Sequence, residues 1–133
     1  MAWTKTETQV QWAAADTKSV AVGVTETSDV LTLQPDTVNA FLKCYAKNGG
    51  TAESGDDVDV AIQYGGDPNA DATENYDNIG DFVTNLDTNE SDPAVRTIPF
   101  MSMQGETLQI AATNNAGSNS ITVGFTVVEE RWS

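Results

Sequence analysis

Alternation of apolar with polar or small residues, at a period of two, recurs along this chain. The clearest runs are AFLKCYAKN (40–48), DVDVAIQY (57–64) and ITVGFTV (121–127), with shorter runs at 20–25 and 108–112. Successive side chains of a strand point to opposite faces, so each run predicts a strand with one buried face. Weaker strand candidates lie at 4–12, 30–34, 82–86 and 95–103. Pro99 indicates that the last of these is an edge strand or holds a bulge.

Segments rich in Gly, Asn and Ser separate the alternating runs. KNGGTAESGDD (47–57) reads as a loop, and TNNAGSNS (113–120) predicts the turn of an antiparallel hairpin. The segment 36–41 has room for one helical turn, and no longer helix is supported. Short strands without helices predict an all-β fold, an antiparallel β-sandwich of jelly-roll type with long acidic loops.

The length of 133 residues predicts a single domain spanning 1–133. Within it, we expect residues 1–12 to form an N-terminal arm or edge strand, and residues 129–133 to form a C-terminal tail. The start MAWTKTETQVQW lacks the apolar core of a signal peptide, and no apolar run is long enough for a membrane span. We therefore expect synthesis in the cytoplasm and no membrane association.

Charge and missing residue types narrow the function. The chain has six Lys and Arg against twenty Asp and Glu, a net charge of −14, which argues against nucleic acid as a partner. It has no histidine, so neither a Ser-His-Asp nor a Cys-His pair can form. Cys44 is the sole cysteine, and within a strand-like run it is expected to be buried. We therefore expect no enzyme, no catalytic residue and no cofactor.

The stretch GDPNADATENYDNIGD (66–81) is the strongest candidate for a metal site. Asp67, Asn69 and Asp71 have the spacing of the first ligands of a calcium loop. An EF-hand also needs Gly at its sixth position and Glu at its twelfth, where this chain has Ala72 and Asn78. The sequence therefore favours a solvated acidic loop with no metal, and leaves these three residues as weak calcium candidates.

The three tryptophans lie near the two ends of the sequence. Their rings either cap the core of the chain's own sandwich or bury against another subunit, because Trp is favoured at protein interfaces. Under the second alternative, the interface residues are Trp3, Trp12, Arg131 and Trp132.

Carbohydrate chemistry offers two further candidates. The carboxylate pairs Asp57/Asp59 and Glu129/Glu130 resemble those of glycosidases, but such pairs are common in any acidic β-protein. Tyr64 and Tyr76 flank the acidic stretch and offer aromatic platforms for a sugar, although the register of Tyr64 with Val58, Val60 and Ile62 favours the core.

The central segment NAFLKCYAKNGGTAESGDDVDVAIQYGG, with the following ENYDNIGDF, carries a family resemblance. In their pattern of strands and turns, residues 18–128 resemble the small β-sandwich virion proteins of tailed bacteriophages, especially capsid decoration (cement) proteins. The resemblance implies a non-enzymatic structural protein, bound to the major capsid protein or other virion proteins outside the head. It also implies a homo-oligomer, with a trimer favoured. Two alternatives stay open: a carbohydrate-binding or adhesion module, and a small tail component such as a completion or tube-end protein.

Overall fold

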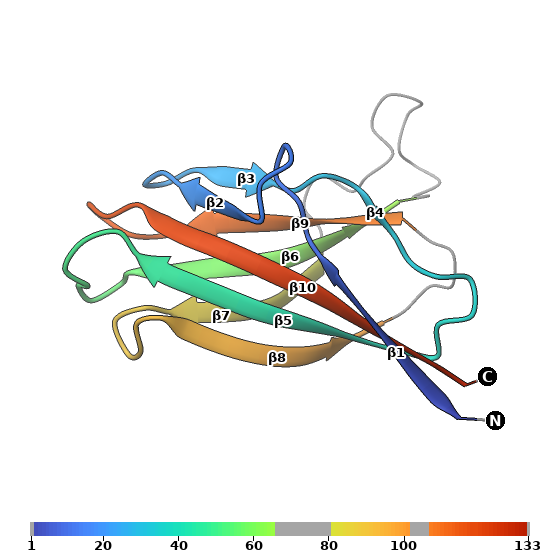
Figure 1. The fold of residues 1–133 in the computed structure, drawn as a ribbon. Helices are drawn as coiled ribbons and strands as arrows, with labels where there is room; N and C mark the ends of the chain where they lie inside the picture. The colour runs from blue at the N-terminus through green and yellow to red at the C-terminus, as the bar shows by residue number, and fades with distance from the viewer. Residues whose placement is uncertain (1, 66–80, 102–106, 133) are drawn as a thin grey trace.

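The computed structural model describes residues 2–65, 81–101 and 107–132 (Figure 1). These residues form ten strands and no helix, so none of them builds a helix able to span a membrane. The strands are β1 (Trp3–Gln9), β2 (Thr17–Val20), β3 (Thr25–Thr27), β4 (Leu31–Thr32), β5 (Asn39–Asn48), β6 (Asp57–Tyr64), β7 (Asp81–Asp87), β8 (Ala94–Phe100), β9 (Thr107–Asn114) and β10 (Ile121–Trp132). The predicted all-β class is confirmed.

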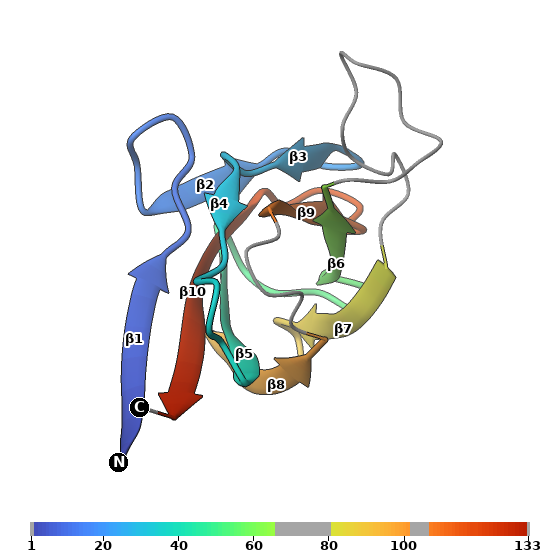
Figure 2. The same ribbon diagram turned by 90° about the vertical axis from the view of Figure 1, so that its right-hand side faces the viewer.

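The described strands build two antiparallel sheets packed face to face (Figure 2). Sheet I has the order β1-β10-β5-β8, with β2 also paired to β10. Sheet II has the order β3-β9-β6-β7, with β4 also paired to β9. β8, which contains Pro99, lies at an edge of sheet I, as the sequence predicted. Proline has no N–H to donate, and an edge strand has no partner on its outer side that would need one.

The strand pairs are nested. β2 pairs with β10, β3 and β4 pair with β9, β5 pairs with β8, and β6 pairs with β7. A long hairpin rolled over on itself gives this order, with the pairs alternating between the sheets. It is the jelly-roll arrangement that the sequence predicted.

Two edge strands are interrupted. β1 and β2 follow one another along the same side of β10, and residues 10–16 leave the sheet between them. β3 and β4 likewise share one side of β9. Asp29 joins the two interruptions, because its N–H donates to the Gln11 carbonyl (2.9 Å) and its carboxylate accepts from the Ala13 N–H. This link ties together the two sheets along one side of the sandwich.

The core fills the space between the sheets with the inward-facing half of each alternating run. Trp12 belongs to it: the side chain is 5% exposed and its ring centroid lies 6.3 Å from that of Phe125. The largest fully buried apolar side chains besides are Phe125, Leu33, Leu42, Ile62, Leu86, Leu108, Ile110 and Ile121.

Four connections between the sheets lie at one end of the sandwich, β2–β3, β5–β6, β7–β8 and β9–β10 (Figure 1). Buried Asp56 holds three of them together. Its carboxylate accepts from the side-chain amides of Asn48 and Asn119, both at 2.9 Å, and its carbonyl accepts from the Thr88 hydroxyl at 2.7 Å. The amide bonds, that of Asn119 first, lower the pKa of Asp56.

Three local predictions are wrong. Residues 113–120 do not close a hairpin, because β9 and β10 belong to different sheets. The run 20–25 is not one strand: β2 ends at Val20 and the chain turns at Gly23, whose φ is +70°. Residues 129–132 are not a tail, because β10 continues through Trp132.

Candidate functional site

The outer face of sheet I is a polar surface to which five strands contribute. The register places outward side chains in rows across the sheet, Gln9–Thr126–Lys43–Thr97 in one row and Thr17–Gly124–Tyr45–Val95 in the next. The alternation that buries Leu42, Cys44 and Ala46 turns Lys43 and Tyr45 outward, so core formation itself positions this face.

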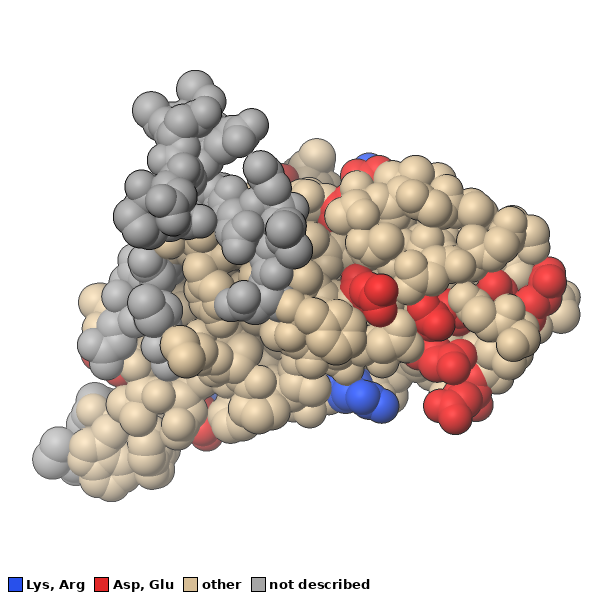
Figure 3. Space-filling view, turned by 180° about the vertical axis from the view of Figure 1, so that it is seen from behind, with Lys and Arg blue, Asp and Glu red and all other residues tan. Residues whose placement is uncertain are grey.

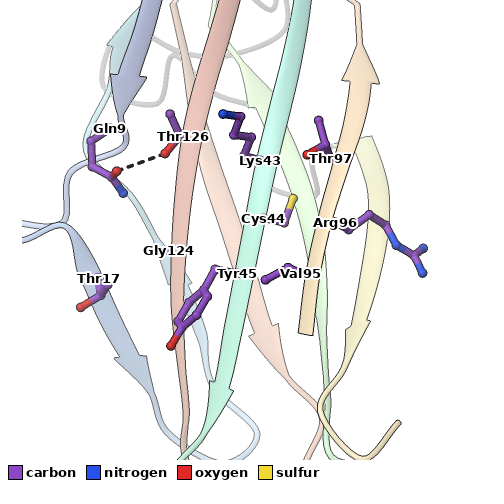
Figure 4. Close-up of a pocket in the computed structure, with 10 residues that line it drawn as sticks. All are labelled: Gln9, Thr17, Lys43, Cys44, Tyr45, Val95, Arg96, Thr97, Gly124 and Thr126. Atoms are coloured by element: carbon purple, nitrogen blue, oxygen red, sulfur yellow. Dashed lines mark hydrogen bonds between the residues drawn. The ribbon is translucent and has the colours of Figure 1, made fainter. Parts of the chain in front are cut away.

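A hollow of about 500 Å³ lies on this face, and the residues that line it are labelled in Figure 4. Its floor includes Gly124. A Cβ added there would lie 3.3 Å from the Thr17 methyl group and 4.0 Å from the Tyr45 ring, so the missing side chain keeps the space between them open. Thr and Gln side chains from β1, β2, β8 and β10 surround it, which gives hydrogen-bonding groups beside one aromatic ring.

Ion pairs connect β1 to β5 beside the hollow. Glu7 accepts from Lys43 Nζ at 2.9 Å and lies 3.5 Å from Lys5 Nζ. The hydrogen bond and charge of Lys43, aided by Lys5, lower the pKa of Glu7. These groups are solvent-exposed, so they fix side-chain positions more than they stabilise the fold.

The far end of the β1–β10 pair carries the second surface feature. Trp3 and Trp132 are directly opposite in the register, and their rings meet edge to face with centroids 5.3 Å apart. They remain 54% and 48% exposed. Figures 1 and 2 show this end of β1 and β10 extending beyond the body of the sandwich, with both marked chain ends beside it.

The structure therefore places the four predicted interface residues at three different locations. Trp3 and Trp132 come together at the surface, whereas Trp12 takes the core alternative. Arg131 alternates with Trp132 on β10 and points to the opposite face, where its Nη1 lies 3.4 Å from Asp36.

Charge is divided between the sheets. All six Lys and Arg lie on strands of sheet I: Lys5, Lys18, Lys43, Lys47, Arg96 and Arg131. Sheet II carries acidic residues instead, and Asp57 stands directly opposite Asp87. Figure 3, seen from behind Figure 1, shows acidic side chains gathered at one end of that face. Only Lys5, Lys43 and Lys47 are on the outer face of sheet I, because the register places Lys18 and Arg96 opposite buried residues and Arg131 points to the other side of β10.

The described residues offer little for catalysis or metal binding. Burial raises the pKa of Cys44 to about 12, opposed by nearby Arg96, so its thiol stays protonated. Glu129 is buried while Glu130 faces outward, so these neighbours do not act as a pair. No group of three acidic or Cys residues in the described ranges could hold a metal.

Several predicted residues lie elsewhere. The calcium candidates Asp67, Asn69 and Asp71 and the sugar platform Tyr76 are outside the described residues. Tyr64 is partly buried against the core, and its hydroxyl donates to the Met101 carbonyl at 2.9 Å. Sequence reasoning missed the hollow, although one signal was present: Gly124 interrupts the alternating run ITVGFTV, and a strand glycine often marks such an opening.

Comparison with known proteins supports the fold alone. No family model matches the chain, and no curated protein sequence is significantly similar to it. Dimeric latent PorU from Porphyromonas gingivalis matches 97% of this chain with a TM-score of 0.54 and 11% identity. This chain spans only 13% of the PorU chain. At that identity, the likeness indicates a shared sandwich fold and nothing about activity.

Two solved structures of more similar length match more weakly. A chain of the acidic stable capsid of Helicobacter pylori bacteriophage KHP30 is 14% identical, with a TM-score of 0.44; the match covers 99% of this chain and all of that chain. The CBM22-1 xylan-binding domain of Paenibacillus barcinonensis Xyn10C is 10% identical, with a TM-score of 0.41; the match covers 98% of this chain and 86% of that domain. Neither likeness carries an argument about function.

Proposed function

We propose that this chain is a non-enzymatic structural protein of a phage particle, bound to the outside of the head as a decoration protein. The exposed Trp3–Trp132 pair carries the proposal, together with the family resemblance of residues 18–128. Two large aromatic rings on a projecting pair of strands offer an anchor for another protein, because Trp dominates the energy of many interfaces.

The charge division fits attachment through sheet I. The outer face of sheet I carries Lys5, Lys43 and Lys47, so it meets an acidic shell surface with less repulsion than sheet II, which carries no basic residue and then faces solvent. A strong acidic charge on the outer side of particles keeps them apart in solution. A protein that binds the assembled shell but not its separated subunits also stabilises that shell.

Binding to purified heads that lack this protein tests the proposal. Trp132→Ala should lower occupancy and the temperature at which the heads break open. Phe82→Ala is the control, because Phe82 is an aromatic residue on sheet II that is at least as accessible as Trp132, at 66% exposed against 48%. Equal occupancy for both variants would remove the Trp pair as the anchor, and binding to tails instead would favour a tail component.

A carbohydrate-binding module is the second candidate, favoured by the hollow at Gly124. Tyr45 is exposed beside it, and polar side chains surround the ring, as sugar sites require. A glycan array would identify a ligand, and Tyr45→Ala should abolish that binding. The same loss in Phe82→Ala would indicate general damage to the protein instead of a site on sheet I.

A further inference from the structure

The outer edge of β1 is open among the described residues. β1 ends the strand order of sheet I, and Figure 2 shows it at the margin of the molecule, with β10 on its inner side. The N–H of Val10 donates to the Phe125 carbonyl, and hydrogen bonding alternates along an antiparallel pair. The N–H and C=O groups of alternate residues from Trp3 to Gln9 therefore point outward.

The other described edges carry features that oppose pairing with another chain. β8 contains Pro99, and β7 has a register shift opposite Val60 and Ala61. β2, β3 and β4 are two to four residues long. β1 has seven residues with neither a proline nor a register shift. Long regular edges of this kind accept a further strand.

The sequence of β1, WTKTETQ, is complementary to itself in reverse. We propose that the edge binds a second copy of this chain, β1 against β1, with a two-fold axis at Thr6. Lys5 of each copy then stands opposite Glu7 of the other, and Trp3 stands opposite Gln9. Opposite charges facing each other across strands are stabilising, and the contact is the same from both sides, as a two-fold dimer requires.

Backbone geometry selects the same register. Lys5 and Glu7 both direct their backbone groups outward, so this pairing joins donors with acceptors. A two-fold axis at Lys5 or at Glu7 also aligns outward groups, but it places like charges opposite each other. A two-fold axis that lies between two residues pairs a residue whose backbone groups point outward with one whose backbone groups are already bonded to β10. Thr6 thus satisfies both the hydrogen bonds and the charges.

The dimer joins two copies of sheet I into one continuous sheet. The outward side chains of β1 keep their face, so both Trp3–Trp132 pairs lie on the same side of the joined sheet. The dimer does not depend on the proposed attachment to a phage head, because it uses the backbone edge of β1, whereas Trp132 lies one strand further in, on β10.

Sedimentation of the full chain, with a monomer mass of 14.2 kDa, tests the dimer. The wild type should sediment at about twice this mass. Lys5→Glu places Glu opposite Glu, and Glu7→Lys places Lys opposite Lys, so each should raise the dissociation constant at least about tenfold. Mixing the two variants restores opposite charges at both positions and should produce a heterodimer.

Lys47→Glu is the control, since it makes the same charge change on sheet I outside β1 and should leave the dimer intact. Amide exchange gives a readout that needs no variant: the amides of Trp3, Lys5, Glu7 and Gln9 should gain protection as protein concentration rises. A monomer or a trimer in the wild type, a dimer that survives in Lys5→Glu, or no heterodimer on mixing would each overturn the proposal.

Discussion

The ring of Trp3 meets the ring of Trp132 edge to face, across the outermost pair of the β1–β10 register. The contact closes the end of two strands that extend past the core, where strand ends otherwise fray. An aromatic pair of this geometry contributes about 1 kcal/mol beyond its buried area.

Trp3→Ala should therefore lower the free energy of unfolding by about 1 kcal/mol, measured by urea denaturation. Trp12→Ala removes a ring from the core and should cost about 3–5 kcal/mol. Similar costs for the two substitutions would mean that the surface pair is as important to the fold as the core ring.

Glu129 holds the connection between β4 and β5 in place through hydrogen bonds to its side chain. Its buried carboxylate accepts from the Gln34 N–H at 2.7 Å and from the Thr37 hydroxyl. Both bonds go to Oε2, so Glu129→Ala leaves both donors without an acceptor and should cost about 2–3 kcal/mol of unfolding free energy. Glu129→Gln keeps a carbonyl oxygen that can accept in the same place, so it should cost less.

Glu130→Ala is the comparison for Glu129, because the neighbouring carboxylate faces outward. We expect it to change the unfolding free energy by no more than about 0.5 kcal/mol. Chemical denaturation of the three variants at pH 7 checks the order, and a costly Glu130→Ala would contradict it.

Asp56 makes the stability of the fold depend on pH in the acidic range. Its folded pKa is lowered, so its contribution is complete above the ordinary carboxyl pKa of about 4 and is lost as pH falls through the lower folded value. Asp56→Asn should be less stable than wild type at pH 7, and the difference should shrink as the pH falls below about 4. Melting temperatures across this range measure it. Glu90→Gln removes an exposed carboxylate and should leave the melting temperature at pH 7 unchanged.

The turn at Ala13 and Ala14 is strained. Both residues have positive φ, 50° and 71°, in a two-residue turn closed by the Trp12–Ala15 bridge. Alanine is disfavoured there because its Cβ crowds the backbone. Ala14→Gly should raise the free energy of unfolding by about 0.5–1 kcal/mol. Ala15→Gly, where φ is not positive, should lower it; stabilisation by both would place the effect outside the turn.

The strands were predictable because the burial of one sheet face produces an alternating pattern in the local sequence. The runs at 40–48, 57–64 and 121–127 each match a strand, since the core side of a sheet imposes alternation on every residue. Prediction failed where a distant contact decides the outcome. The segment 113–120 has the composition of a hairpin turn, yet Asn114 is buried and its side chain donates to the Val20 carbonyl, which turns the chain toward sheet I.

The candidate surfaces were predictable only in part. The sequence drew attention to Trp3 and Trp132, but their contact depends on the pairing of β1 with β10, which sequence alone does not reveal. Trp12 was ambiguous because the excursion at 10–16, which carries its ring into the core, has no periodic pattern. The hollow at Gly124 is lined by residues of five strands in register, so no single segment of the sequence predicts it.

The nested strand pairing has a consequence for the order of synthesis. β10 lies between β1 or β2 and β5, yet it is the last of the described strands to leave the ribosome. Until then β5 lacks one neighbour and β1 and β2 lack theirs, so sheet I has no centre. The core therefore stays open until β10 has been made, and its folding waits on contacts between the first and the last of the described strands.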